Sequence, residues 1–235
     1  MLATGPFEKA KRYIENKTTG KEPQVKYNIG PCITISREAG AGSDLIAGKI
    51  VDYLMPKQKD PSIEWGVFDK NLIEKVLEDH NLPSVLKKFV EDEPKTLSNM
   101  LNELFGIHPP ILKLIHKATE TIFNLSSIGN VIIIGRGSNI ITKALPNSFH
   151  VRLVAPVDFR IKNVREFYGN TKKEAEDFIR TEDLKRTKFV YDNFHIKADD
   201  PLQYHIIINA ELFGIEGVAK LIGDSVMLKF PGFYK

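Results

Sequence analysis

The sequence predicts an α/β fold in which a parallel sheet is flanked by helices. Two observations support this prediction. Short runs rich in β-branched residues, such as Val-Ile-Ile-Ile at 131–134, are apolar without interruption, which is typical of strands buried on both faces. Segments with apolar residues at helical spacing separate these runs. Strands that alternate with helices favour a parallel sheet with right-handed crossovers.

The first expected element is a short amphipathic helix over residues 7–14. Residues 17–27 are polar and contain Gly20 and Pro23, which is typical of a linker. We therefore interpret residues 1–27 as a leader helix and linker, followed by one domain over residues 28–235.

The remaining elements follow in chain order. Strands are predicted by β-branched or apolar runs at 32–36, 64–68, 131–134, 149–155 and 206–209. A helix is predicted to start after the glycines at 40–42 and to stop before Pro56, and a second helix to run from Asp69 to about residue 77. Residues 81–130 are predicted to be helical with breaks at prolines. Further helices are predicted at 158–167, 172–190 and 215–222.

The composition is that of an ordinary globular protein. The 235 residues are 42% hydrophobic and 27% charged, and the formal net charge is +3. This small positive excess argues against a surface that wraps nucleic acid, so we expect no nucleic acid polymer as a partner. The length fits one large domain or two small ones, and it does not indicate an oligomeric state.

Cysteine, histidine and hydropathy patterns exclude further classes. The single cysteine, Cys32, excludes a disulfide framework and a multi-cysteine metal site, and the six histidines show no metal-ligand spacing. We assign no metal-ligating residues. No apolar run approaches the roughly 20 residues that span a bilayer, and residues 1–20 do not resemble a secretory signal. We expect a cytoplasmic protein with no membrane contact.

A glycine-rich turn follows the first predicted strand, at the edge of the sheet where α/β proteins bind ligands. The turn leads into a helix and offers backbone N–H groups to an anion. Its candidate anion-binding residues are Gly40, Ala41, Gly42, Ser43 and Asp44. Against the pattern G-x-x-x-x-G-K-[ST], only the second glycine is in place. The alternative is an ordinary strand-to-helix turn with Ser43 or Asp44 near the helix cap.

The chain uses arginine sparingly, with eight arginines against 25 lysines. Arginine binds phosphate or carboxylate through two parallel hydrogen bonds, and seven of the eight lie in segments expected to converge on one anion site. Arg136 stands between Gly135 and Gly137, which leaves its guanidinium free to reach into the crevice. The alternative is that several arginines cap helices or pair with nearby acids.

The predicted helix at 172–190 carries Arg180, Asp183 and Arg186 at positions i, i+3 and i+6. These side chains share a broad face. They form either a surface ladder or a clamp in which the aspartate orients guanidiniums around a transferring phosphoryl group. Arg160 lies upstream on a neighbouring helix. Asp69 follows the second strand and is predicted to cap a helix or to touch a substrate.

Six motifs occur in a characteristic order over residues 31–223. They are I-x-I-S-R-E-x-G-x-G, F-D-K-x-L-I, V-I-I-I-G-R-G-x-N, H-V-R-L-V-A-P, R-x-x-D-x-x-R and I-I-I-N. This order resembles the cytidylate kinase-like family, a branch of the P-loop nucleoside monophosphate kinases. The resemblance implies a three-layer P-loop NTPase-like fold with a five-stranded parallel sheet, a helical substrate-binding insertion at about 81–129 and a mobile lid at about 168–195.

The resemblance also implies a reaction, the transfer of the γ-phosphoryl group of ATP to CMP or a related nucleotide with Mg²⁺. Residues 40–44 would then cradle the ATP phosphates. Asp69, Arg136, Gly137 and Arg160 would bind the acceptor nucleotide. The catalytic residues would be Arg37 and the lid residues Arg180, Asp183 and Arg186.

The chain departs from true cytidylate kinases at three places. Ser43 replaces the P-loop lysine, Gly137 replaces the acid of the G-R-D motif, and Asp69-Lys70-Asn71 stands where those kinases have a D-S-G-A-x-Y-R stretch. Arg37 or a lid arginine could supply the missing charge. Two alternatives therefore stay open, namely a nucleotide-binding sensor or regulatory protein without catalysis, and a dinucleotide-binding Rossmann protein. The third glycine of the Rossmann pattern is absent, since Leu45 occupies its position.

Overall fold

The computed structural model of the chain describes residues 5–18, 29–78 and 111–235. Its centre is a sheet of five parallel strands in the order β2-β3-β1-β4-β5. The strands are β1 (Cys32–Arg37), β2 (Gly66–Phe68), β3 (Val131–Ile134), β4 (Ser148–Val154) and β5 (Ile206–Asn209). Two of the five predicted strands match to the residue. The first two differ by one or two residues at one end, and β4 is shifted by one residue at both ends.

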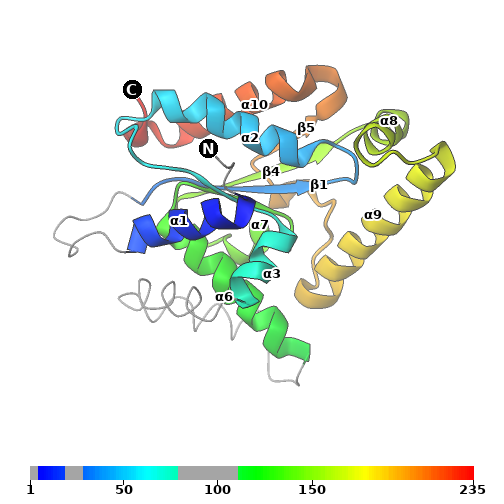
Figure 1. Cartoon of the computed structure of the whole chain (residues 1–235), viewed down its shortest axis with the longest axis horizontal. Helices are drawn as coiled ribbons and strands as arrows, with labels where there is room; N and C mark the ends of the chain where they lie inside the picture. Colours follow the sequence, from blue (N-terminus) through cyan, green and yellow to red (C-terminus); the bar gives the residue numbers. More distant parts are fainter. Residues whose placement is uncertain (1–4, 19–28, 79–110) are drawn as a thin grey trace.

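Helices cover both faces of the sheet, so the domain has three layers (Figure 1). One face carries α2 (Ser43–Leu54) and α10 (Ala210–Lys229). The other carries α1 (Pro6–Thr18), α3 (Lys70–Glu78), α6 (Ile111–Ile128) and α7 (Ser138–Ile141). Short 3-10 turns lie at Met55–Lys57, Pro201–Gln203 and Pro231–Phe233. Within the described residues, no helix is long and apolar enough to cross a membrane.

The strand sequences follow from this burial on both faces. In β1, Ile33 and Ile35 pack under α2 and α10, whereas Cys32 faces the opposite layer. In the register of the sheet, Ile33 lies between Ile132 of β3 and Phe149 of β4. Because successive side chains point to opposite faces and both faces are covered, the central strands are apolar at almost every position.

Helix α1, within the segment that we interpreted as a leader, packs against the core. Its residues Ala10, Tyr13 and Ile14 are buried in the layer formed by α3, α6 and β2. The hydroxyl of Tyr13 donates to the carbonyl oxygen of Gly129 at 2.5 Å. Of the linker predicted at residues 17–27, residues 17 and 18 belong to α1, and residues 19–27 lie outside the described part of the chain.

Helices α8 (Val157–Tyr168) and α9 (Lys172–Phe194) project from the carboxyl-terminal edge of the sheet (Figure 1). They pack on each other through Ile161, Val164, Ala175 and Ile179, and Ala39 of the β1–α2 loop joins this cluster. This pair includes the segment that we predicted as the lid. Of the predicted insertion, residues 81–110 lie outside the described residues, and most of the rest is helix α6.

Candidate functional site

The β1–α2 loop has the backbone that its glycines predict. Gly40 and Gly42 have φ angles of 82° and 84°, in the left-handed region that favours glycine. A Cβ atom on Gly40 would lie 2.6 Å from the carbonyl oxygen of Arg160, so the loop also depends on the absence of a side chain there. Gly42 is the N-cap residue of α2 and has no side chain to cap it. Ser43 and Asp44 follow in the first turn of α2, near the cap as the ordinary-turn alternative expects, but neither is the N-cap residue.

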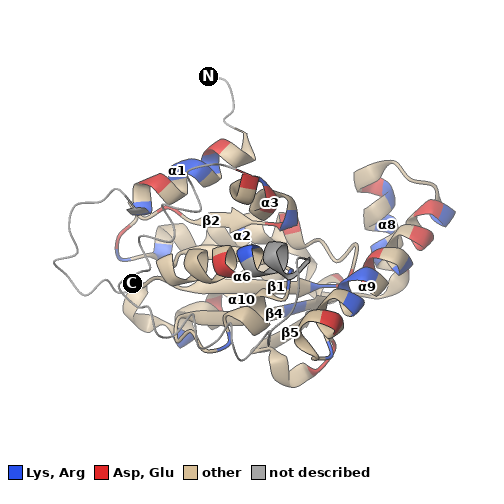
Figure 2. Ribbon diagram, turned by 90° about the horizontal axis from the view of Figure 1, so that it is seen from below, with Lys and Arg blue, Asp and Glu red and all other residues tan. Residues whose placement is uncertain are grey.

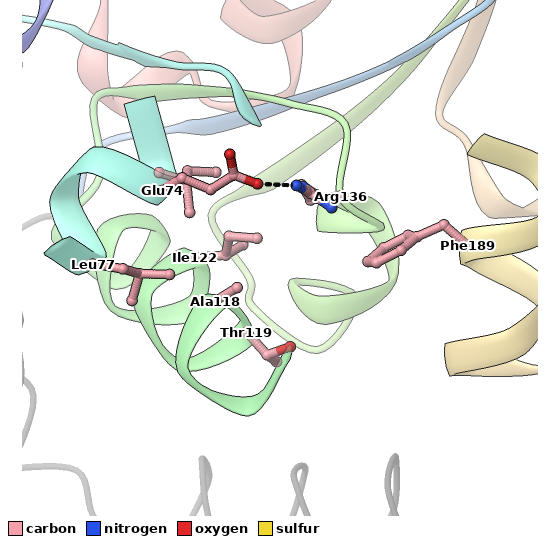
Figure 3. A pocket seen from close by; sticks show the side chains of 8 residues that line it. Glu74, Leu77, Ala118, Thr119, Ile122, Arg136 and Phe189 are labelled. Carbon is pink, nitrogen blue, oxygen red and sulfur yellow. Dashed lines mark hydrogen bonds and ion pairs between the residues drawn. The ribbon is translucent and has the colours of Figure 1, made fainter. Parts of the chain in front are cut away.

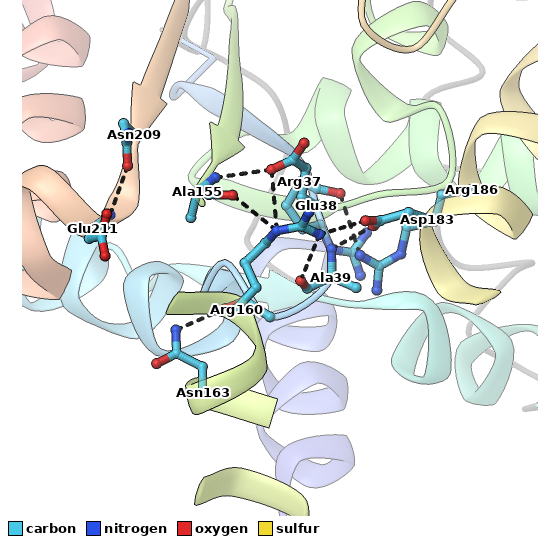
Figure 4. Close-up of polar contacts among 11 residues, drawn as sticks. Arg37, Glu38, Ala39, Ala155, Arg160, Asn163, Asp183, Arg186, Asn209 and Glu211 are labelled. Atoms are coloured by element: carbon cyan, nitrogen blue, oxygen red, sulfur yellow. Dashed lines mark hydrogen bonds and ion pairs between the residues drawn. The ribbon is translucent and has the colours of Figure 1, made fainter. Parts of the chain in front are cut away.

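Asp183 of α9 reaches this loop (Figure 4). Its Oδ1 atom accepts a hydrogen bond from the backbone N–H of Ala39 at 2.7 Å, and its Oδ2 atom lies 2.6 Å from Nη1 of Arg160. Arg160 is 12% exposed and also donates to the carbonyl oxygen of Ala155 at 3.0 Å. All of these Arg160 contacts are internal, so in this structure the arginine fastens α8 to the loop and to α9.

Arg37 and Arg186 bring two guanidiniums to the end of β1 (Figure 4). Nη1 of Arg186 donates to the carbonyl oxygen of Arg37 at 3.4 Å. Burial of the guanidinium, and then the neighbouring charge of Arg186, lower the pKa of Arg37 to about 10, which leaves it charged at neutral pH. Its Nε atom is buried and has no hydrogen-bond partner among the described residues. The two neighbouring guanidiniums, together with the unused Nε–H donor of Arg37, are suited to binding an anionic ligand.

Gly135, which follows β3, makes room for Arg37. A Cβ atom at Gly135 would lie 2.0 Å from Nη1 of Arg37, and the φ angle of this glycine is 82°. Gly137 lies against the ring of Phe194, where a Cβ atom would come within 2.4 Å. The two glycines that flank Arg136 in the sequence therefore have separate packing roles.

Arg136 itself has a strained backbone, because it is a non-glycine residue with a φ angle of 57° between two glycines that also have positive φ. Its guanidinium pairs with the carboxylate of Glu74 on α3 and lies over the ring of Phe189, 5.3 Å from the ring centroid. These three side chains line a pocket with five residues of α3 and α6, namely Ile73, Leu77, Ala118, Thr119 and Ile122 (Figure 3).

Two other candidates have local roles in the structure. Asp69 caps α3, since its Oδ1 atom accepts from the backbone N–H of Leu72 at 2.7 Å. Arg180 has 79% of its side chain exposed and pairs with Asp177, three residues earlier on the same helix. Arg180 thus belongs to a surface ladder, the alternative that its spacing left open, and the structure does not bring it to the loop.

The expectation that seven arginines converge is also too broad. Arg152 donates to the carbonyl oxygen of Ala198 at 2.7 Å, and Arg165 is exposed near the end of α8. Among the described residues, the arginines that meet at the loop are Arg37, Arg160 and Arg186. Arg136 instead pairs with Glu74 and lies over the ring of Phe189.

Four residues of the site were missed by sequence reasoning. Glu38 accepts from the backbone N–H of Ala155 at 3.0 Å, and Asn163 donates to the carbonyl oxygen of Gly40 at 2.8 Å. Glu74 and Phe189 line the pocket of Arg136. Phe189 lies three residues after Arg186 on α9, so helical spacing could have placed it on the same face. Glu74 carries no such signal, because its partner is distant in the sequence.

Comparison with known structures gives the fold. An uncharacterized protein from Eubacterium ventriosum ATCC 27560 aligns with a TM-score of 0.64 and 19% sequence identity, covering 83% of this chain and 97% of that chain. A shikimate kinase from Bacteroides thetaiotaomicron aligns with a TM-score of 0.44 and 15% identity, covering 86% of this chain and 98% of that chain. No curated protein matches the sequence.

The sheet order and the helices on both faces confirm the predicted fold class, a three-layer α/β fold with a five-stranded parallel sheet. The sheet order also disagrees with the Rossmann alternative, in which β2 rather than β3 lies beside β1. A sequence model of the cytidylate kinase-like family matches residues 32–212, most of the chain, and the protein therefore belongs to the cytidylate kinase-like family.

Proposed function

We propose that this nucleotide kinase-like protein transfers the γ-phosphoryl group of ATP to CMP or a related nucleoside monophosphate. The observation that carries the proposal is the meeting of two guanidiniums, those of Arg37 and Arg186, beside the glycine loop at the carboxyl end of β1. Phosphoryl transfer depends mainly on positioning and on neutralising the charge of the transferring group. These residues can supply both.

The residues of the loop fit a polyphosphate. Gly40 and Gly42 allow the backbone to curl closely, and the first turn of α2 lacks a side-chain cap at its N-cap position. Ser43 replaces the usual lysine, and its hydroxyl supplies no positive charge. Arg37, whose Nε atom is buried and unpartnered among the described residues, is the substitute that we assign for this charge.

Mg²⁺ fits the same edge of the sheet. Asp44 and Asp69 lie close enough to Arg37 to act on its pKa, and their carboxylates are the hard oxygen ligands that Mg²⁺ prefers beside substrate phosphates. When bound, the ion would neutralise part of the negative charge of the substrate phosphates. We assign Asp44, which is exposed in the first turn of α2, as the first candidate to hold it.

The acceptor nucleotide is assigned to the pocket of Arg136. The guanidinium would bind the acceptor phosphate, and Phe189 with the apolar residues of α3 and α6 would contact the remainder of the nucleotide. An oxygen of the acceptor phosphate then attacks the γ-phosphorus of ATP. The bond from this phosphorus to the bridging oxygen breaks, and ADP leaves with that oxygen. Arg37 and Arg186 stabilise the negative charge on the oxygens of the transferring group.

A coupled assay with ATP, Mg²⁺ and each of CMP, dCMP, UMP and AMP tests this function. We expect turnover with at least one of the four acceptors, and background rates for all four would retire the proposal. The motif departures at Ser43 and Gly137 favour one second candidate, a nucleotide-binding protein without catalysis. Nucleotide binding by calorimetry, together with an inactive coupled assay, would support that candidate instead.

A further inference from the structure

Asp183 occupies a position suited to a ligand. Its two carboxylate oxygens accept from the backbone N–H of Ala39 at 2.7 Å and face the guanidinium of Arg160 at 2.6 Å (Figure 4). A loop N–H and a guanidinium are the same donors that a phosphoryl oxygen uses in proteins. The carboxylate of α9 and an oxygen of a bound phosphate cannot occupy these donors together.

The donors are held in place without Asp183. Arg160 donates from Nε to the carbonyl oxygen of Ala155 at 3.0 Å, and Glu38 lies 3.6 Å from the same nitrogen. The loop is held on its other side by Asn163, which donates to the carbonyl oxygen of Gly40. These polar contacts come from α8 and from the residues that follow β1 and β4, so the two donors keep hydrogen-bond partners other than Asp183.

We propose that Ala39 N–H and Arg160 form an anion subsite for a phosphoryl oxygen of the ATP polyphosphate, and that Asp183 fills this subsite in the ligand-free protein. Binding of the polyphosphate exchanges the carboxylate for a phosphoryl oxygen and releases α9 from the loop. The inference rests on the proposed function, since it assigns the loop to polyphosphate.

This arrangement has a consequence for affinity. Because the internal carboxylate competes with the ligand, the measured dissociation constant exceeds the intrinsic one by the inverse of the open fraction. Removal of the carboxylate should therefore tighten binding of any polyphosphate that uses the subsite. If Asp183 instead contacts the bound nucleotide, its removal should weaken binding.

The test compares wild type with Asp183→Asn and Asp183→Ala. The probe is inorganic tripolyphosphate, titrated by calorimetry without acceptor. We expect both variants to bind tripolyphosphate at least about threefold more tightly than wild type. In hydrogen exchange measured by NMR, the amide of Ala39 should exchange faster in Asp183→Ala, because its hydrogen bond to the carboxylate is lost. Asp177→Asn is the matched control on the same helix and should change neither quantity, since Asp177 pairs with exposed Arg180.

Unchanged or weaker tripolyphosphate binding in both Asp183 variants would overturn the inference. Asp183→Asn keeps the shape of the side chain, so it remains informative if the alanine variant does not fold. The two proposals can fail separately. Tighter tripolyphosphate binding in the variants, together with no turnover of any nucleotide by wild type, would support the subsite and reject the kinase activity. Nucleotide turnover by wild type, together with weaker tripolyphosphate binding in the variants, would support the kinase activity and reject the subsite.

Discussion

The backbone carbonyl of Arg37 accepts a hydrogen bond from the guanidinium of Arg186, 149 positions later in the chain. Through this contact α9 presents a cation to the end of β1, where Arg37 already carries one. The pKa of Arg37 is lowered first by burial of its guanidinium and then by the neighbouring charge of Arg186. The negative charge of a bound phosphoryl group would offset both effects.

Arg186→Ala is therefore expected to lower kcat more than it raises KM. If Arg186 acts on charge that develops in the transition state, its loss removes little ground-state binding. We expect kcat of the variant to fall about 100-fold or more, because removal of one donor that stabilises transition-state charge typically has an effect of this size. Steady-state kinetics with varied ATP at saturating acceptor measure both constants.

Arg180→Ala is the matched control for this prediction, because Arg180 lies on the same helix, is exposed and pairs with Asp177. Its kinetic constants should stay close to those of wild type. A rise in KM with unchanged kcat for Arg186→Ala would show that Arg186 only holds the ground state.

Arg136→Ala is expected to weaken binding of the monophosphate acceptor while leaving the melting temperature unchanged. A hydrogen bond to a charged group contributes about 1.5–3 kcal/mol, so the dissociation constant for CMP should rise about tenfold or more. Calorimetry with CMP in the absence of ATP measures this change. An unchanged affinity for CMP would remove Arg136 from the acceptor site.

The substitution at Arg136 also leaves Glu74 without its partner in the ion pair. The double variant Arg136→Ala with Glu74→Gln separates the two effects. If the weak binding came only from repulsion by the unpaired carboxylate, the double variant would recover the affinity of wild type. We expect it to remain weak, because the guanidinium is absent from both.

Much of the fold could be predicted because its signals are local. The central strands have both faces covered, which makes them continuously apolar, and Pro56 follows the end of α2 closely. The packing of α1 was not predictable in this way. Tyr13 and Ile14 are buried against α3, α6 and β2, which are distant in the sequence, so its helical pattern alone gave no information about its partners.

The site was predictable in part for a similar reason. The glycines of the loop and the position of Arg37 follow from β1 and its turn, which are adjacent in the sequence. On α9, the spacing of Arg180, Asp183 and Arg186 allows several pairings, and the sequence does not choose between them. In the structure Asp183 pairs with Arg160 of another helix, and Arg180 pairs with Asp177. Such choices depend on how α8 and α9 pack.

Gly40→Ala is expected to destabilise the protein by about 1–3 kcal/mol. Alanine strains the backbone at a φ angle of 82°, and its Cβ atom would lie 2.6 Å from the carbonyl oxygen of Arg160. Urea unfolding followed by circular dichroism measures the difference. Gly48→Ala is the control in the next helix, because a Cβ atom there meets nothing within 4 Å. It should stabilise the protein by about 0.5–1 kcal/mol through helix propensity. Equal stabilities of the Gly40 variant and wild type would contradict the loop geometry.

The final prediction concerns pH and is independent of the site. His150 is buried in β4, with its Nδ1 atom 2.9 Å from the hydroxyl of Thr34 and its ring 4.9 Å from that of His205. Burial, followed by the charges of His205, Lys229 and Lys143, lowers the pKa of His150 from 6.5 to about 3. The unfolded chain therefore binds a proton at higher pH than the folded chain does.

Stability contributed by neutral His150 is complete above pH 6.5 and is lost as pH falls from 6.5 towards 3. The loss is about 1.4 kcal/mol for each pH unit within this window. Urea unfolding at pH 7, 6 and 5 measures this loss of stability, in a range where most carboxylates stay ionised.

His150→Gln should flatten the decline of stability with falling pH. The control His195→Asn replaces an exposed histidine with a φ angle of 55° and should retain the decline. An equally steep decline in His150→Gln would show that another group carries the pH dependence.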